Sequence, residues 1–230
     1  MFYITGDKHG DFTFLERFCK MANTTKDDVL IILGDAGINY YCDIQDKLKK
    51  DYIKDFPITL FCIHGNHEAR PCTIASYKEK EMFGGKVYID ESYPNQIFAI
   101  DGEVYDFNGK KTLVIGGAYS VDKKYRMAHG YHWFADEQPS EEIKNKVRQT
   151  LKEREAKVDF IFSHTCPLRY EPVEWFLSCV DQSTVDRSTE IFLDDIEANT
   201  SYERWFCGHF HGEKEIDKMC FLFNSILTLC

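Results

Sequence analysis

Carboxylate, amide and imidazole side chains recur beside glycines or at the ends of short apolar runs in this sequence. Seven of them are candidate metal ligands: Asp7, His9, Asp35, Asn66, His164, His209 and His211. Asp7 and His9 are two residues apart, as are the last two histidines, and this spacing points both members of a pair to one side of an extended segment. Carboxylates and imidazoles suit Mn, Fe or Zn better than metals that prefer thiolates. Because seven ligands exceed what one ion takes, the set predicts two divalent cations about 3.5–4 Å apart.

The distribution of histidine supports this interpretation. A single histidine at a strand end is usually an ordinary hydrogen-bonded residue, and an aspartate after glycine is usually a turn or cap residue. However, five of the 8 histidines stand at such positions in separate parts of the chain: His9, His67, His164, His209 and His211. The remaining histidines are expected to have structural or surface roles: His64, His129 and His132.

The first third of the chain repeats one pattern that would position several of these residues. Short apolar runs at residues 2–5, 29–33 and 58–63 end at Gly or His-Gly, which is typical of buried strands. Between them, residues 11–19 and 43–54 have apolar side chains at helical spacing. Strand, helix and strand within about 30 residues form the β-α-β unit, whose strands are parallel. Since ligands bind beyond the carboxyl ends of parallel strands, the polar residues after each run are expected at one site.

The second half of the chain has a different pattern. Asn108-Gly109 between two strand-like runs predicts a β-hairpin over residues 104–115. Residues 118–138 show no clean period and are predicted to form a long loop. Further elements are expected as helices at 139–156 and 184–198, and as strands at 160–163 and within 220–230. We expect a single domain, residues 1–230, with two packed sheets.

Composition narrows the class of protein. The 230 residues include 28 basic and 38 acidic side chains, for a formal net charge of −10. This balance disfavours binding of extended nucleic acid, which needs clustered cations, although metal ions can still hold a small anionic substrate. We expect no membrane span and no signal peptide, because the apolar runs are short and polar residues appear early. The 9 cysteines include no Cys-x-x-Cys pair and indicate free thiols in a cytoplasmic protein.

Five segments of the sequence, taken in order, resemble the signature blocks of the calcineurin-like metallophosphoesterases: Gly6-Asp7-Lys8-His9-Gly10, Gly34-Asp35, Gly65-Asn66-His67-Glu68, His164 and Gly208-His209-Phe210-His211. One such block alone is weak, but five in the correct order over residues 6–212 are specific. The resemblance implies the fold of that family, an α/β protein built as a four-layer αββα sandwich of two mixed β-sheets flanked by helices.

The resemblance also implies a role for each matching residue. These roles form four groups: Asp7, His9 and His211 on the first metal; Asn66, His164 and His209 on the second; Asp35 bridging both; and His67 on the substrate phosphate, assisting the leaving oxygen. His67 and Asp35 would thus be the catalytic residues. The implied cofactors are two divalent ions, with Mn as first choice and Fe, Zn, Ni or Mg as alternatives. Such ions would relieve the repulsion between the two aspartates and activate a bridging water for in-line attack on phosphorus.

The second block departs from that of the protein serine/threonine phosphatases. It reads Gly-Asp-Ala-Gly-Ile-Asn from Gly34 onward, and it lacks the second aspartate and the arginine of Gly-Asp-x-Val-Asp-Arg-Gly. The last block, Gly-His-x-His, looks more like the phosphodiesterase and nucleotidase branches. With that arginine missing, Arg70 and Arg126 are the candidates to bind substrate phosphate together with Asn66 and His67.

The sequence therefore predicts a metal-dependent hydrolase for a small phosphomonoester or phosphodiester, nucleotide-like in structure. The expected partner is this small phosphorylated substrate, without a membrane or extended nucleic acid. The alternatives are a serine/threonine protein phosphatase, a DNA or RNA nuclease of the same fold, and a catalytically silent scaffold. The scaffold is disfavoured because relatives that lose activity usually lose ligands, whereas all seven ligands and His67 are present here.

Overall fold

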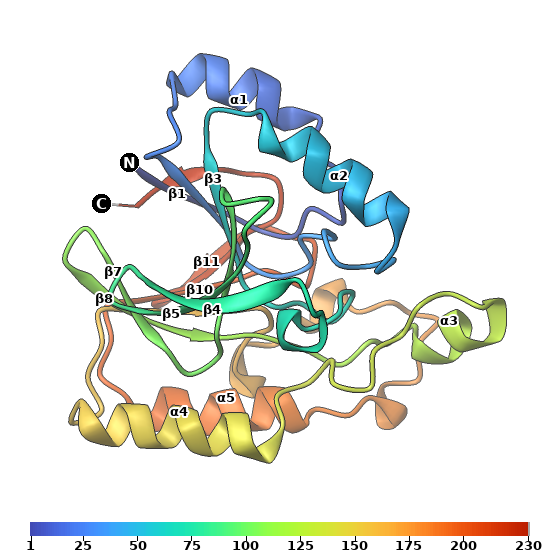
Figure 1. Ribbon diagram of the computed structural model, residues 1–230. Coiled ribbons are helices and arrows are strands. Elements are labelled where there is room, and N and C mark those ends of the chain that lie inside the picture. Colours follow the sequence, from blue (N-terminus) through green and yellow to red (C-terminus); the bar gives the residue numbers. More distant parts are fainter. Residues whose placement is uncertain (230) are drawn as a thin grey trace.

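A computed structural model describes residues 1–229, which form two mixed β-sheets packed face to face (Figure 1). The first sheet has the strand order β13-β1-β2-β3-β6-β5-β4. Its strands have these bounds: β1 (Phe2–Thr5), β2 (Val29–Ile32), β3 (Thr59–Cys62), β4 (Tyr77–Met82), β5 (Gly85–Asp90), β6 (Gln96–Ala99) and β13 (Leu227–Thr228). The neighbours β1, β2, β3 and β6 are parallel, as the β-α-β pattern predicted for the first three.

The second sheet has the strand order β11-β12-β10-β9-β8-β7. Its strands have these bounds: β7 (Val104–Phe107), β8 (Lys110–Ile115), β9 (Phe160–Ser163), β10 (Arg204–Cys207), β11 (Lys214–Ile216) and β12 (Met219–Phe221). The hairpin predicted at Asn108-Gly109 is confirmed, because β7 and β8 pair in antiparallel register around it. Strands β8, β9, β10 and β12 are parallel. Cys230, the end of the predicted tail segment, lies outside the described residues.

Helices cover the outer face of each sheet (Figure 1). Helices α1 (Phe14–Ala22) and α2 (Ile44–Lys54) pack on the first sheet, and α4 (Glu141–Glu153) and α5 (Ser188–Asn199) on the second. The predicted four-layer αββα sandwich is therefore confirmed. None of the helices within residues 1–229 combines the length and the apolar character that a bilayer span requires.

Alternate residues of one strand serve two different cores. In β2, Leu30 and Ile32 face the helices, whereas Ile31 faces the other sheet. A strand buried on both faces reads as a continuous apolar run, which is why the sequence signal was clear. Phe61 of β3 lies in the core between the sheets and packs edge-to-face on Phe107 at 5.2 Å.

Helices α1 and α5 start furthest from their predicted positions. Helix α1 begins at Phe14 instead of residue 11, because the Asp11 carboxylate accepts hydrogen bonds from the backbone N–H and hydroxyl of Thr13 and forms a turn. Helix α5 begins at Ser188 instead of residue 184, after a short 3-10 helix at Gln182–Thr184 (η4). Other 3-10 helices lie at Pro71–Thr73 (η1), Leu168–Tyr170 (η2) and Val173–Trp175 (η3).

The prediction of one long loop over residues 118–138 was wrong in part. This stretch contains helix α3 (Lys123–His129), and none of the residues in α3 is buried. A helix that buries no side chain needs no apolar face, so its sequence has no helical period to detect.

The core between the sheets gives a stability prediction. We expect Phe61→Ala to lower the free energy of unfolding by about 3–5 kcal/mol, because a fully buried ring is replaced by a cavity. Met21→Ala serves as the control, since Met21 is 74% exposed and its loss should change stability by less than about 0.5 kcal/mol. Urea unfolding of both variants measures the difference, and a loss below about 1 kcal/mol for Phe61→Ala would argue against this core.

Candidate metal centre

The turns after five parallel strands meet at one place. The first sheet contributes Asp7 and His9 after β1, Asp35 after β2, and Asn66 and His67 after β3. The second sheet contributes His164 after β9, and His209 and His211 after β10. Side-chain and ring contacts link these residues into a single cluster. The structure thus brings together all seven predicted ligands and His67.

Asp35 lies at the centre of the cluster and is 2% exposed. Its Oδ1 accepts a hydrogen bond of 2.8 Å from the backbone N–H of His67. Its Oδ2 lies 3.7 Å from His164 Nε2 and 3.8 Å from His9 Nδ1. One carboxylate oxygen is therefore fixed by the backbone, while the other faces imidazole nitrogens from both sheets.

Asp7 repeats this arrangement. Its Oδ1 accepts a hydrogen bond of 2.9 Å from the backbone N–H of His209, and its buried Oδ2 has no hydrogen-bond partner within residues 1–229. That Oδ2 lies 3.4 Å from His211 Nε2 and 3.8 Å from His9 Nε2, and these two nitrogens are 2.8 Å apart. A buried carboxylate oxygen without a partner is costly, and a cation among these three atoms would satisfy it. The donor set therefore fits a divalent metal ion.

His164 is oriented by a backbone carbonyl. Its Nδ1 donates a hydrogen bond of 2.8 Å to the Leu33 carbonyl, so the lone pair of the neutral ring is at Nε2. This Nε2 lies 2.8 Å from Asn66 Oδ1, and Asn66 Nδ2 donates to the Ser120 hydroxyl at 2.8 Å. His164 Nε2 and Asn66 Oδ1 are then two acceptors that face each other, and a metal ion bound by both atoms would explain their contact.

The electrostatics of the cluster favour charged carboxylates, and they act differently on its individual histidines. Burial opposes ionisation of both aspartates, but the charges of His164 and other nearby histidines offset it, so the pKa values of Asp7 and Asp35 lie below their ordinary value. Burial holds the pKa of His209 well below its ordinary value. The adjacent carboxylate of Asp7, by contrast, raises the pKa of His211. Ionised carboxylates and neutral imidazoles are the forms that bind metal.

Several residues of the cluster have unusual backbone conformations. A positive φ, rare outside glycine, occurs at four candidate ligands: His9 (46°), Asp35 (44°), His209 (67°) and His211 (50°). Strained backbone of this kind persists where the surrounding structure fixes it, and it concentrates at functional sites.

Two glycines of the signature blocks make room for the carboxylates. A Cβ atom at Gly65 would overlap Oδ1 of Asp35, and one at Gly208 would overlap Oδ1 of Asp7. The same two oxygens accept hydrogen bonds from backbone N–H groups just after these glycines, those of His67 and His209. The close approach of backbone and carboxylate therefore requires glycine at both positions.

His67 has partners that the sequence analysis predicted only in part. Arg126 Nη2 donates to His67 Nδ1 at 2.5 Å, so the proton of the neutral ring is at Nε2. Asp122 binds Arg126 Nε at 2.8 Å, and its Oδ1 lies 3.7 Å from His67 Nε2. Arg126 therefore lies at the site. Asp122 and the Ser120 that binds Asn66 were not predicted, because the stretch between residues 118 and 138 offered no sequence pattern to single them out.

The other predicted arginine has different partners. Arg70 Nη1 binds Asp101 at 2.6 Å, and its Nε donates to the Asp136 carbonyl at 2.9 Å. Its polar partners among residues 1–229 include none of the candidate ligands.

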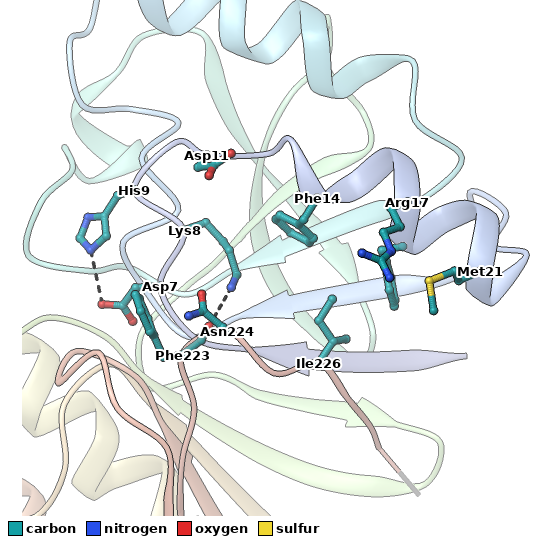
Figure 2. Close-up of a pocket in the computed structure, with 11 residues that line it drawn as sticks. Asp7, Lys8, His9, Asp11, Phe14, Arg17, Met21, Phe223, Asn224 and Ile226 are labelled. Carbon is teal, nitrogen blue, oxygen red and sulfur yellow. Dashed lines mark hydrogen bonds and ion pairs between the residues drawn. The ribbon is translucent and has the colours of Figure 1, made fainter.

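A cavity of about 450 Å³ borders Asp7 and His9 (Figure 2). Lys8, which stands between them in sequence, points toward the carboxy-terminal segment, and its Nζ donates a hydrogen bond of 2.7 Å to the Phe223 carbonyl. Burial lowers the pKa of Lys8 to about 8. Lys8 thus ties the loop that carries two candidate ligands to the carboxy-terminal segment.

The packing around Gly208 gives a prediction about metal binding. We expect Gly208→Ala to weaken Mn²⁺ binding by at least about 10-fold, because the new methyl group displaces the Asp7 carboxylate. Gly109→Ala is the control: a Cβ there meets nothing within 4 Å, and although its φ of 83° makes alanine strained, that strain lies in the β7–β8 turn and should leave the affinity for Mn²⁺ unchanged. Isothermal titration calorimetry measures both affinities. Wild-type affinity in Gly208→Ala would show that Asp7 is not a ligand.

Comparison with known proteins agrees with this geometry. The chain matches the family model described as calcineurin-like phosphoesterase over residues 1–213. No curated protein sequence matches it. The crystal structure of TT1561 of Thermus thermophilus is similar with 13% identity and a TM-score of 0.52, over 96% of this chain and 87% of that chain. A second crystal structure is similar with 15% identity and a TM-score of 0.51, over 96% of this chain and 88% of that chain.

These two structures share the fold at low identity, whereas the family match covers the segments that contain every candidate ligand. That family consists of hydrolases that act on phosphoric esters and typically bind two divalent metal ions. The chain therefore belongs to the calcineurin-like phosphoesterase family.

Proposed function

We propose that the protein hydrolyses a small phosphomonoester or phosphodiester, nucleotide-like in structure, with two divalent cations, Mn²⁺ being our first choice. The observation that carries this proposal is the pair of buried carboxylates, Asp7 and Asp35. Each has Oδ1 bound to a backbone N–H and Oδ2 turned toward imidazole nitrogens. Two buried negative charges near each other require compensating positive charge, and divalent cations supply it.

The candidate ligands divide between two ions. We assign them in three groups: Asp7, His9 and His211 to the first cation; Asn66, His164 and His209 to the second; and Asp35 to both. The approach of His9 Nε2 and His211 Nε2 to Asp7 Oδ2 supports the first group, and the contact of His164 with Asn66 supports the second. When bound, such cations polarise phosphate oxygens and lower the pKa of water, which provides a nucleophile at neutral pH.

The phosphate itself would meet His67 and Arg126. The guanidinium of Arg126 is oriented by Asp122 and carries a permanent positive charge suited to phosphate oxygens. His67 carries its proton at Nε2 in this arrangement, where it is available to the leaving oxygen as a general acid. Asn66 contributes a neutral oxygen, so it adds no negative charge where the phosphate binds. Arg70, held by Asp101, is assigned a structural role instead.

Sequence features support one branch of the family over others. The second block lacks the additional aspartate and arginine of the protein serine/threonine phosphatases, and the Gly-His-x-His block resembles phosphodiesterases and nucleotidases. A net charge of −10 argues against a nuclease. The clustering of the candidate ligands argues against a silent scaffold.

Removal of the bridging ligand tests the mechanism. We expect Mn²⁺-loaded protein to hydrolyse p-nitrophenyl phosphate or its diester, EDTA to abolish this activity and Mn²⁺ to restore it. Asp35→Asn should lower kcat by at least about 100-fold, because it removes the charge between the cations. Asp27→Asn, an exposed aspartate outside the cluster, should retain activity. Activity that survives both EDTA and Asp35→Asn would contradict the proposed function.

Removal of the guanidinium tests the assignment of phosphate binding. We expect Arg126→Ala to raise KM by about 10–100-fold and to weaken competitive inhibition by inorganic phosphate, because a charged hydrogen bond to phosphate is lost. Arg126→Lys should recover part of the loss, and the exposed Arg148→Ala should behave as wild type. An unchanged KM and phosphate inhibition in Arg126→Ala would remove Arg126 from the site.

A further inference from the structure

A second cavity, of about 320 Å³, extends from the candidate metal centre, and we call its apolar part the chamber. Its lining includes the candidate ligands Asp35 and His211. Apolar side chains from the segment between β9 and α5, and from the loop after β10, form its walls: Trp175, Phe176, Val180, Val185 and Phe210. Its volume is at the low end of the range for small-molecule sites, so it suits one compact group.

The aromatic walls are held in place by neighbouring rings. Trp175 packs edge-to-face on Phe221 of β12 with centroids 5.9 Å apart. The rings of Phe176 and Phe210 are nearly parallel, with centroids 6.4 Å apart and an interplanar angle of 20°. Flat aromatic surfaces next to a phosphate site favour a planar, apolar group on the alcohol side of the ester.

The carboxyl group of Glu190 is buried at the wall of this chamber, and one of its oxygens has no hydrogen-bond partner within residues 1–229. Glu190, in the first turn of α5, lines the cavity and is only 5% exposed. Its Oε1 accepts a hydrogen bond of 2.8 Å from the Thr165 hydroxyl, but its Oε2 has no partner within residues 1–229. Burial raises the pKa of Glu190 to about 7. An unpaired buried carboxyl oxygen is expensive, and a ligand that donates a hydrogen bond would satisfy it.

The charges around the chamber exclude a second phosphate. Its lining includes the carboxylates Asp122, Glu171 and Glu190. The guanidinium of Arg187 is already engaged by Glu171 at 3.0 Å and by Gln182 at 2.8 Å. The net negative charge of the lining would therefore repel a negatively charged group. A neutral group that donates hydrogen bonds would find acceptor oxygens there.

We propose that this cavity is the leaving-group subsite and selects esters whose alcohol bears a planar heteroaromatic ring with an N–H donor, of the nucleobase kind, with Glu190 accepting that hydrogen bond. The assignment of this cavity to the leaving group rests on the proposed function. It adds Glu190 to that function as a specificity-determining residue.

Binding of free nucleosides tests the subsite without any hydrolysis. The ligands are adenosine and guanosine, which have exocyclic amino donors, and purine riboside, which lacks them. Calorimetry on the metal-loaded full chain should show at least one donor nucleoside binding about 10-fold or more tightly than purine riboside. Glu190→Leu should abolish this preference, and Glu190→Gln, which keeps an oxygen acceptor without the charge, should retain part of it. Glu174→Leu is the matched control, since Glu174 lies in η3 next to the wall residue Trp175, has a side chain 51% exposed and does not line the cavity, so it should leave the preference intact.

Hydrolysis by the same variants separates the two proposals. Glu190→Leu should lower kcat/KM for the matching nucleotide by about 10-fold or more and leave p-nitrophenyl phosphate, which has no N–H, unaffected. Equal binding of purine riboside and the donor nucleosides by wild type would overturn the subsite, as would an equal loss for every ligand in Glu190→Leu. Absence of Mn²⁺-dependent hydrolysis by wild type would instead overturn the proposed function, while the nucleoside preference would still decide whether Glu190 recognises a base.

Discussion

The central constraint on this structure is that two carboxylates, Asp7 and Asp35, are buried close to one another. Like charges in a desolvated setting repel. Among residues 1–229, each carboxylate accepts a hydrogen bond from a single backbone N–H, which belongs to another signature block. The remaining oxygens face histidines of both sheets. Glycine at positions 65 and 208 leaves room for the two carboxylates to lie against the backbone. Four candidate ligands have a positive φ, so the backbone around the carboxylates is strained. In the proposed function, bound divalent cations supply the positive charge that stabilises this arrangement.

The fold supplies the geometry that this arrangement needs. Parallel strands at the centre of each sheet bring their carboxyl ends to one site, and the core between the sheets fixes the distance between them. The candidate ligands that follow β1, β2 and β3 can therefore meet those that follow β9 and β10, and each lies only a few residues from the end of its strand. The stretch around α3 and the segment between β9 and α5 lie beside this centre. They contribute Arg126, Asp122 and the apolar chamber, which are the features that would decide which phosphoester is bound.

The sequence allowed prediction wherever the structure leaves a local pattern of residue types along the chain. Doubly buried strands appear as apolar runs, and ligands that follow them appear beside glycine, so the sandwich and the cluster were predictable. Strand β4 (Tyr77–Met82) was not predictable, since four of its six residues are charged and exposed. Helix α3 was not predictable either, because it has no buried apolar face. Ser120, Asp122 and Glu190 acquire their roles only through contacts with distant residues, which no local pattern records. Arg70 was chosen because it is near His67 in sequence, but Asp101 binds it.

The most direct test of the central claim is the number and position of metal ions in a crystal of the Mn²⁺-loaded protein, located by anomalous scattering. We expect two manganese peaks, one bound by Asp7 and His211 and the other by Asn66 and His164, with Asp35 touching both. A single peak, or two peaks that do not share Asp35, would contradict the account, because one buried carboxylate would then be stabilised in some other way.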